Sequence, residues 1–214
     1  MPDLSHELRL LSESDGPVAG LDEVGRGPWA GPVVACAVLL PEPHAPMAGL
    51  PAAIYTALDD SKKLSAERRE ALYEPLLGAV PHGFGEASVA EIDELNILQA
   101  SLLAMRRALA ALPCPAGCAL VDGNRDPGLG IPTRLIVKGD SASIAIAAAS
   151  ILAKVRRDRQ MIALAEDYPD YGWDSNMGYG TAAHRAGLDL HGVTPHHRTS
   201  FAPIRARLQT VLNI

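Results

Sequence analysis

The chain has 214 residues, of which 48% are hydrophobic and only 4% aromatic, so we expect one compact domain over residues 1–214 with an aliphatic core. No apolar stretch approaches the ~20 residues that a membrane-spanning helix needs, which argues against a membrane partner. The formal net charge of −6 is unfavourable for nucleic-acid binding, but residues 1–99 carry 6 basic and 16 acidic side chains and residues 100–214 carry 13 and 9. This split is a weak indication of a binding face, since solvated helix faces give similar counts.

The first third of the chain predicts two strands between less regular segments. Residues 1–15 are polar and predict a frayed terminus or a short helix. Apolar runs predict strands at 18–24 and 33–40, joined by a glycine-rich turn. The four prolines within 41–51 predict a loop.

Helical signals follow. Ser65 is expected to cap a helix at 66–78. A short strand is predicted at 84–89. Helical periodicity then predicts a helix at 91–112, with a break near Asn96.

Strands and helices alternate in the second half. We predict strands at 119–122 and 134–138, a long alanine-rich helix at 143–167 packed closely on a sheet, and a loop at 168–178. Two further helices are predicted, at 181–191 and 200–212. This order indicates an α/β fold with a central mixed sheet flanked by helices and a small helical C-terminal region.

The three cysteines, Cys36, Cys114 and Cys118, bear on the compartment. Cys114 and Cys118 are spaced like half of a metal site, but no second Cys or His pair in the sequence completes it. We therefore interpret all three as reduced thiols in a reducing compartment and expect a cytoplasmic protein.

Adjacent carboxylates, Asp22 and Glu23, lie in the glycine-rich run 20–32. Two neighbouring carboxylates repel each other, and beside apolar Leu21 and Val24 their charge is costly unless a cation joins them. Taken alone, such a pair is more often a polar turn between two strands.

Four acidic residues occupy the ends of predicted strands: Asp22, Glu23, Asp122 and Asp140. Ligands collect at strand ends in α/β sheets. Four carboxylates there could hold two divalent ions about 4 Å apart, an arrangement that cleaves phosphodiesters. One ion would lower the pKa of an attacking water, and the other would stabilise the leaving 3′ oxygen. Ligands that are all oxygens favour Mg²⁺ or Mn²⁺ over Zn²⁺.

Strand geometry restricts this hypothesis. Neighbouring residues on a regular strand point to opposite faces. Asp22 and Glu23 therefore share a site only if the strand is bulged or ends there, or if Glu23 contributes its backbone carbonyl. Gly25 and Gly27 favour such a distortion.

Seven segments carry a resemblance to a known family: 20–28 (GLDEVGRGP), 60–64 (DSKKL), 121–124 (VDGN), 138–140 (KGD), 148–158 (AASILAKVRRD), 178–181 (GYGT) with His184, and 195–201 (PHHRTSF). Together they resemble type 2 ribonuclease H, the ribonuclease HII of bacteria. The resemblance extends over about residues 17–205, and the combination is highly specific.

The resemblance implies a ribonuclease H-like fold and metal-dependent hydrolysis of the RNA strand of RNA–DNA hybrids. It also implies nicking on the 5′ side of a single ribonucleotide embedded in duplex DNA, which leaves a 3′ hydroxyl and a 5′ phosphate. The expected role is therefore ribonucleotide removal from DNA, with two Mg²⁺ or Mn²⁺ ions bound during catalysis.

The family's site residues can be transferred to matching positions. Its catalytic and metal-binding acids match Asp22, Glu23, Asp122 and Asp140. Its Gly-Arg-Gly segment, which reads the 2′-hydroxyl that distinguishes RNA from DNA, matches Gly25, Arg26 and Gly27. Its tyrosine that packs on the sugar of the following deoxynucleotide matches Tyr179. Family members often have lysine where this chain has Met177, so one phosphate contact is expected to be missing or replaced.

Several polar residues have two open interpretations. Lys62 and Lys63 either bind backbone phosphates or form a solvated loop pair. Ser150 and Lys154 share one helix face with Asp158, which either lines the substrate groove or is an ordinary salt-bridged face.

His184 and His197 are expected to be structural hydrogen-bonding groups rather than metal ligands. Arg198 is a candidate phosphate contact.

The residues weigh against two alternatives to a hydrolase. A non-catalytic protein that binds hybrids would have been indicated by a missing acid, and all four are present. A polynucleotidyl transferase of the same fold would need an end-recognition domain or a partner site, which the sequence does not indicate. We expect a monomer that binds RNA–DNA hybrids and ribonucleotide-containing duplex DNA; a sliding-clamp motif is not recognisable at 208–214.

Overall fold

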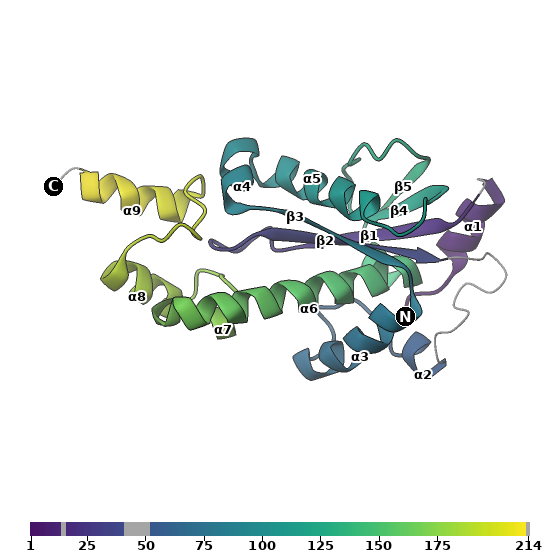
Figure 1. Ribbon diagram of the computed structural model, residues 1–214, viewed down its shortest axis with the longest axis horizontal. Helices are drawn as coiled ribbons and strands as arrows, with labels where there is room; N and C mark the ends of the chain where they lie inside the picture. Colours follow the sequence, from purple (N-terminus) through teal and green to yellow (C-terminus); the bar gives the residue numbers. More distant parts are fainter. Residues whose placement is uncertain (14–15, 41–51, 213–214) are drawn as a thin grey trace. The chain divides into compact units, whose positions relative to one another are not determined.

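The computed structural model describes residues 1–13, 16–40 and 52–212 and divides into two compact units (Figure 1). The first unit comprises Met1–Val24, Val34–Glu86 and Leu102–Val155, and the second comprises Gly25–Val33, Ala87–Ser101 and Arg156–Ile214. The loop expected at 41–51 lies outside the described residues.

A five-stranded mixed sheet forms the centre of the first unit. Its strands are β1 (Val18–Val24), β2 (Val33–Leu40), β3 (His82–Ala87), β4 (Cys118–Asp122) and β5 (Thr133–Ile136). Their order across the sheet is β3-β2-β1-β4-β5. β1 is antiparallel to β2 and parallel to β4, and β4 is parallel to β5. The predicted α/β class with a mixed sheet is confirmed.

The α-helices of the described chain are α1 (Ser5–Glu13), α2 (Ala52–Tyr55), α3 (Ala66–Ala79), α4 (Val89–Leu95), α5 (Ile97–Ala110), α6 (Ile144–Asp167), α7 (Trp173–Asn176), α8 (Ala182–His191) and α9 (Ala202–Leu212). Ser65 caps α3 by accepting a hydrogen bond from Arg68 N at 3.2 Å, as predicted. Asn96, with φ of 72°, separates α4 from α5 where a break was expected.

Three predictions of local structure were wrong. The segment 168–178 is not a continuous loop, because it contains the 3₁₀ helix η2 (Pro169–Tyr171) and α7. The third strand lies two residues earlier than 84–89. β5 ends at Ile136 because Lys138 adopts a left-handed conformation (φ 58°), and the 3₁₀ helix η1 (Gly139–Ser141) follows.

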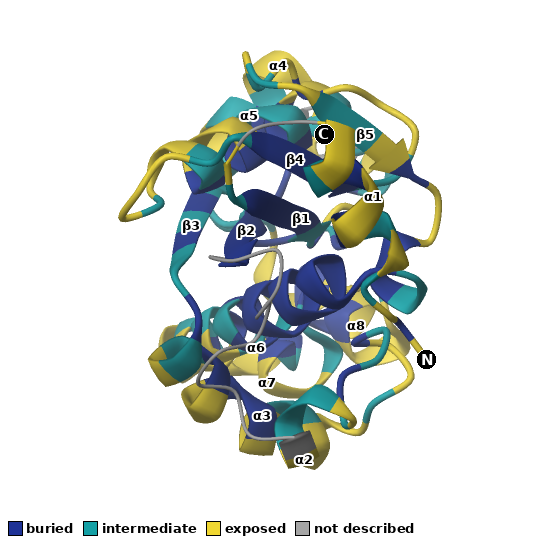
Figure 2. Ribbon diagram, turned by 90° about the vertical axis from the view of Figure 1, so that its right-hand side faces the viewer, coloured by how far each residue is buried: buried dark blue, intermediate teal, exposed yellow. Residues whose placement is uncertain are grey.

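Two helices cover opposite faces of this sheet (Figures 1 and 2). α6 approaches β1 so closely that a Cβ at Gly20 would overlap the backbone of Ala145. α5 approaches β3 in the same way, where a Cβ at Gly85 would overlap the backbone of Ala104. The dark-blue strands of Figure 2 are buried between these helices, and their side chains are largely Val, Ala and Leu. The expected aliphatic core is confirmed.

The N-terminal segment fixes the start of α6. Glu7 is fully buried, and its Oε1 accepts hydrogen bonds from Ser143 Oγ (2.6 Å) and Ala145 N (2.9 Å). Burial raises the pKa of Glu7, and these hydrogen bonds oppose that rise. Asp3 also pairs through its backbone with Ala142 and Ile144. A distant carboxylate thus caps α6 a few residues after Asp140.

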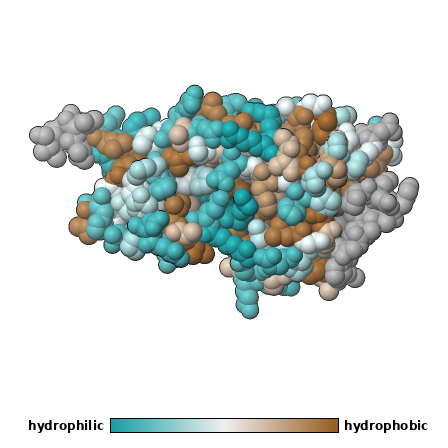
Figure 3. Space-filling model, viewed as in Figure 1, coloured by the Kyte–Doolittle hydropathy of each residue, from teal (hydrophilic) through white to brown (hydrophobic). Residues whose placement is uncertain are grey.

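Hydrophilic residues cover much of the face drawn in Figure 3, with hydrophobic ones in smaller groups between them. Within residues 1–13, 16–40 and 52–212, no helix has the length and apolar character required to cross a membrane.

Candidate active site

The four predicted acids all belong to the first unit. Asp22 and Glu23 lie near the end of β1, and Asp122 is the last residue of β4. β1 and β4 are parallel and paired through Leu21 and Val121, so Asp22 and Asp122 both come directly after the last paired residues. Asp140 lies in η1, four residues after the end of β5, whereas the predicted strand 134–138 would have ended two residues before it.

β1 is not bulged toward β2 at the acidic pair. Its pairing with β2 remains one-to-one through Asp22–Cys36, Glu23–Ala35 and Val24–Val34. The two side chains therefore leave the strand on opposite faces. A bulge is therefore excluded as the way in which Asp22 and Glu23 share a site. Two possibilities remain: the pairing of β1 with β4 ends after Leu21, which frees this end of β1, or Glu23 contributes its backbone carbonyl.

Electrostatic repulsion acts among the four acids, and it raises the pKa of Asp22 and of Asp140. Burial raises the pKa of Asp22 well above its ordinary value, and the charges of Glu23 and Asp122 raise it further, against a hydrogen bond from Ser150. Burial, with the charges of Asp60 and Asp122, raises the pKa of Asp140 to about 6. Asp22 and Asp140 are 5% and 4% exposed, so water screens this repulsion weakly. A divalent cation would relieve it.

The carboxylates are not arranged around one metal position in this structure. In the described chain, no three His, Cys, Asp or Glu side chains are arranged as a ready ligand set for a metal. Backbone groups hold two oxygens: Asp22 Oδ1 accepts from Glu23 N (2.7 Å), and Asp122 Oδ1 accepts from Gly139 N (2.6 Å). Each carboxylate has a second oxygen that could bind a cation. The all-oxygen donor set fits Mg²⁺ or Mn²⁺.

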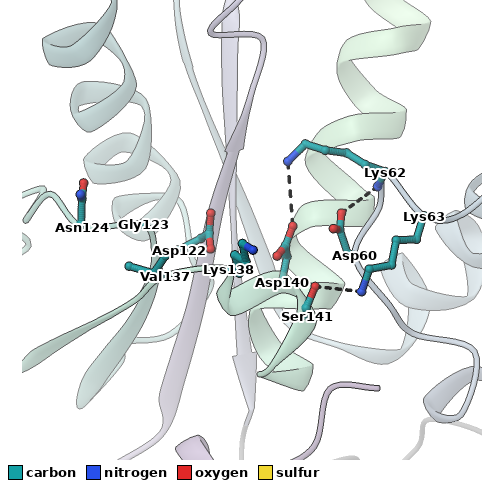
Figure 4. Close-up of a pocket in the computed structure, with 10 residues that line it drawn as sticks. All are labelled: Asp60, Lys62, Lys63, Asp122, Gly123, Asn124, Val137, Lys138, Asp140 and Ser141. Atoms are coloured by element: carbon teal, nitrogen blue, oxygen red, sulfur yellow. Dashed lines mark hydrogen bonds and ion pairs between the residues drawn. The ribbon is translucent and has the colours of Figure 1, made fainter.

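An open cavity of about 610 Å³ adjoins Asp122 and Asp140 (Figure 4). It is lined by Asp60, Lys62, Lys63, Asp122, Gly123, Asn124, Val137, Lys138, Asp140 and Ser141. Figure 4 shows carboxylates and lysines from separate segments meeting around it. Its volume is in the range of ligand-binding clefts.

The two lysines of the 60–64 segment reach this cavity. Lys62 Nζ lies 4.0 Å from Asp140 Oδ2. Burial lowers the pKa of Lys62, but the nearby carboxylates, Asp22 and Asp140 foremost, outweigh that effect and raise it. Lys63 Nζ donates to Asp59 Oδ1 (3.2 Å) and Ser141 Oγ (3.0 Å). Both side chains are exposed at the cavity, and their phosphate contact stays a prediction.

Asp60 is a site residue that sequence reasoning did not single out. Its Oδ1 accepts from Lys62 N at 2.9 Å, and its side chain is hydrogen-bonded to Asp140. The sequence did contain a sign of its role, because Asp60 is the first residue of the 60–64 segment that resembles the family. It was not singled out because it lies in a loop, whereas the four predicted acids were identified by their positions at strand ends.

Ser150, for which a groove-lining position and an ordinary helix face were both open, has a buried side chain. Its side chain is 2% exposed and donates to Ser61 Oγ at 2.8 Å. It also forms a hydrogen bond with Asp22, so it helps to position a carboxylate of the site. Lys154, one turn further along α6, is half-buried.

The second unit contains the Gly-Arg-Gly segment and Tyr179. Gly25 has φ of +95°, which favours glycine, and Arg26 and Gly27 are exposed. A Cβ at Gly27 would lie 3.1 Å from the ring of Tyr179, so the two are neighbours. Tyr179 is 50% exposed, so its ring is accessible to a ligand.

Arg198, the candidate phosphate contact, has backbone partners in this structure. Its side chain is fully buried, and its guanidinium donates to backbone carbonyls of the segment 25–32. The acceptors are the oxygens of Gly25, Arg26, Pro28, Gly31 and Pro32. The sequence indicated a phosphate contact for Arg198 and gave no indication of these backbone partners.

A buried histidine pair supports the backbone of Tyr179. His184 Nδ1 lies 3.0 Å from Tyr179 O, which only accepts, so Nδ1 carries the proton. His184 Nε2 then accepts from Trp173 Nε1 (3.2 Å) and His197 Nε2 (3.0 Å). Thr194 N donates to His197 Nδ1. Both rings are neutral, and the expected structural role is confirmed.

This network predicts a loss of stability in acid. Burial, then the charge of His184, lowers the pKa of His197 to about 4 from 6.5. The unfolded chain therefore binds more protons between these values, and stability falls as pH decreases through them. We expect His197→Gln to lower the melting temperature at neutral pH and to flatten its decline below pH 6.5, as measured by circular dichroism. Exposed His191→Gln is the control and should keep the wild-type dependence of melting temperature on pH. If the melting temperature of His197→Gln fell with pH as steeply as that of wild type, His197 would not be the source of the acid sensitivity.

Comparisons with known proteins agree with this geometry. A family model described as ribonuclease HII matches residues 19–204. The ribonuclease HII of Rhodospirillum rubrum is 57% identical over 210 residues, covering 97% of this chain and 92% of the relative. The crystal structure of ribonuclease H2 from Pyrococcus horikoshii OT3 is similar with a TM-score of 0.76 at 25% identity, covering 92% of this chain and 100% of that one. Bst-RNase HIII in complex with Mn²⁺ shares the fold, with a TM-score of 0.72 at 21% identity over 92% of this chain and 71% of that one.

Proposed function

The chain belongs to the ribonuclease HII family of metal-dependent ribonucleases, which cleave RNA in RNA–DNA hybrids, and from this premise we propose a more specific activity. The enzyme nicks duplex DNA on the 5′ side of a single embedded ribonucleotide, leaving a 3′ hydroxyl and a 5′ phosphate, in ribonucleotide removal from DNA. Residues 1–214 act as one catalytic domain in this proposal. All the proposed site residues come from one chain, so no second copy is required.

The observation that carries the proposal is the position of three acids: Asp22 and Asp122 follow the last paired residues of β1 and β4, and Asp140 shares a cavity with Asp122. These carboxylates, with Glu23 through its side chain or backbone, would hold two Mg²⁺ or Mn²⁺ ions. Bound there, the ions would supply an activated water and stabilise the leaving oxygen. The crystallised Mn²⁺ complex of Bst-RNase HIII, which shares the fold, is in line with this choice of metal.

The protein's own groups would position the substrate. Gly25, Arg26 and Gly27 would contact the 2′-hydroxyl, and the exposed Tyr179 ring beside Gly27 would pack on the next sugar. Lys62 and Lys63 would bind phosphates at the cavity, with Lys62 exchanging its contact to Asp140 for a phosphate oxygen as the cation takes its place.

A nicking assay tests the proposal. Three duplexes are compared in Mg²⁺: all-DNA, DNA with one ribonucleotide, and a long RNA–DNA hybrid. We expect a single nick 5′ of the ribonucleotide, multiple cuts in the hybrid and none in all-DNA. Cleavage of the hybrid alone would refute the single-ribonucleotide activity. Binding without cleavage would support the rival hypothesis of a non-catalytic hybrid-binding protein.

A further inference from the structure

We propose that two buried arginines, Arg198 and Arg157, are positioning residues that hold the loop 25–32 in the shape that discriminates ribose from deoxyribose. This inference rests on the proposed function, because it takes Gly25–Gly27 to be the segment that contacts the 2′-hydroxyl. Neither arginine touches substrate in this proposal. Each acts through the backbone of the loop, and every residue involved belongs to the second unit.

All three nitrogens of the Arg198 guanidinium donate hydrogen bonds to carbonyls of the loop 25–32. Nη2 donates to Gly25 O (2.6 Å) and Pro32 O (3.1 Å), at the two ends of the loop. Nη1 donates to Arg26 O (3.1 Å) and Pro28 O (2.8 Å), and Nε donates to Gly31 O (2.9 Å). One side chain therefore ties together both ends and the middle of the loop.

Arg157 joins the same loop to the segment before Tyr179. Its Nε donates to Pro32 O (2.9 Å), Nη2 to Ala30 O (3.1 Å) and Nη1 to Met177 O (3.0 Å). Its side chain also occupies the space of a Cβ at Gly25, which is a second reason, besides the positive φ, for glycine there. The loop and the Tyr179 segment are thereby fixed to one side chain.

These contacts orient the donors of the loop. In a trans peptide, the C=O of one residue and the N–H of the next point in opposite directions. Because Gly25 O and Arg26 O face the guanidinium of Arg198, the N–H groups of Arg26 and Gly27 are directed away from it. The same relation holds at Pro28: its carbonyl accepts from Arg198, while the following Trp29 N–H donates outward to Gly178 O at 2.8 Å. The clamp thus presents successive N–H groups to a ligand hydroxyl.

Only arginine fits this role. A guanidinium offers five N–H donors in a rigid planar fork, whereas a lysine ammonium has three on a flexible stem. Burying two guanidinium groups is costly, and burial lowers the pKa of Arg198 to about 9 and of Arg157 to about 10, so both stay charged at neutral pH. A packing role alone would be served by apolar side chains at lower cost.

The test is Arg198→Lys, with Arg205→Lys as the matched control, because Arg205 is an exposed arginine on α9. Cleavage of a duplex with one ribonucleotide gives kcat and KM, and inhibition by the all-DNA duplex gives Ki. We expect kcat to fall about 10²-fold from the misplaced loop. The ratio of Ki to KM measures the preference for the ribonucleotide duplex over all-DNA, and it should fall about tenfold, which is the effect of losing one hydrogen bond. Ki itself should stay within about twofold, because binding of all-DNA does not use the 2′-hydroxyl contact. The control should match wild type.

The outcomes separate this inference from the proposed function. If the wild-type enzyme does not prefer the ribonucleotide duplex over all-DNA, the proposed function fails. If wild type has the preference and Arg198→Lys keeps the same Ki-to-KM ratio, losing only melting temperature, Arg198 is merely structural and the inference is overturned. Should Arg198→Lys not fold, Arg157→Lys decides in the same assay, since it loosens the loop while the contact of Arg198 with Gly25 remains.

Discussion

Asp140→Asn is expected to abolish cleavage of both the single-ribonucleotide duplex and the long hybrid, and Asp22→Asn and Asp122→Asn are expected to do the same. The amide keeps the size of the carboxyl group but loses the charge that would bind a cation. Removing one preorganised electrostatic group costs about 10²–10³-fold in turnover, and loss of a metal ligand should reach at least that. Initial rates in Mg²⁺ under saturating enzyme measure the effect.

Stability distinguishes loss of chemistry from loss of fold. Burial and neighbouring acids raise the pKa of Asp140 to about 6, so its ionised form destabilises the metal-free protein. Asp140→Asn should therefore melt ~2–4 °C higher than wild type in chelator at neutral pH, which corresponds to about 1 kcal/mol. Exposed Asp126→Asn is the control and should change neither activity nor melting temperature. Near wild-type turnover by Asp140→Asn would remove that acid from the catalytic set.

The sequence predicted most of the sheet because its signals are local. β1 and β2 have the predicted bounds, and Ser65 and Asn96 mark helix ends through side-chain and backbone preferences of single residues. The acidic cluster was also predictable, since parallel neighbours such as β1 and β4 bring their carboxyl ends to one edge. Asp140 was displaced into η1 by the left-handed Lys138, a conformation that lysine rarely adopts and no local pattern announces.

Side-chain partners could not be predicted in the same way. Arg198 and Ser150 both belong to segments that resemble the family, and both were assigned to the substrate. The structure buries them instead, one under the carbonyls of the loop 25–32 and the other between Ser61 and Asp22. A sequence identifies which polar residues are unusual, but the direction of their side chains depends on groups far away in the chain: backbone carbonyls 166–173 residues away for Arg198 and the side chain of Ser61, 89 residues away, for Ser150. Residues that support a site are therefore easily mistaken for residues that contact the ligand.

Removal of divalent metal is expected to eliminate cleavage, and Mg²⁺ or Mn²⁺ should restore it. The acids form an oxygen-only donor set whose repulsion a cation relieves. Activity that persists after exhaustive chelation would contradict a metal-dependent site at Asp22, Asp122 and Asp140.

Metal should also change the pH dependence of stability. Asp140 has a folded-state pKa of about 6 against an ordinary value of 3.8, so the folded protein binds more protons in this interval. Without metal, its contribution therefore makes stability fall as pH rises from about 4 through 6. A cation binds the ionised acids and opposes that fall. A cation at a concentration of about 100 times its dissociation constant adds about 2.7 kcal/mol to the free energy of unfolding. Because the acids are more fully ionised at pH 7 than at pH 5, the difference in melting temperature between metal and chelator should be larger at pH 7. A gap that is independent of pH would show that the cation binds away from these carboxylates.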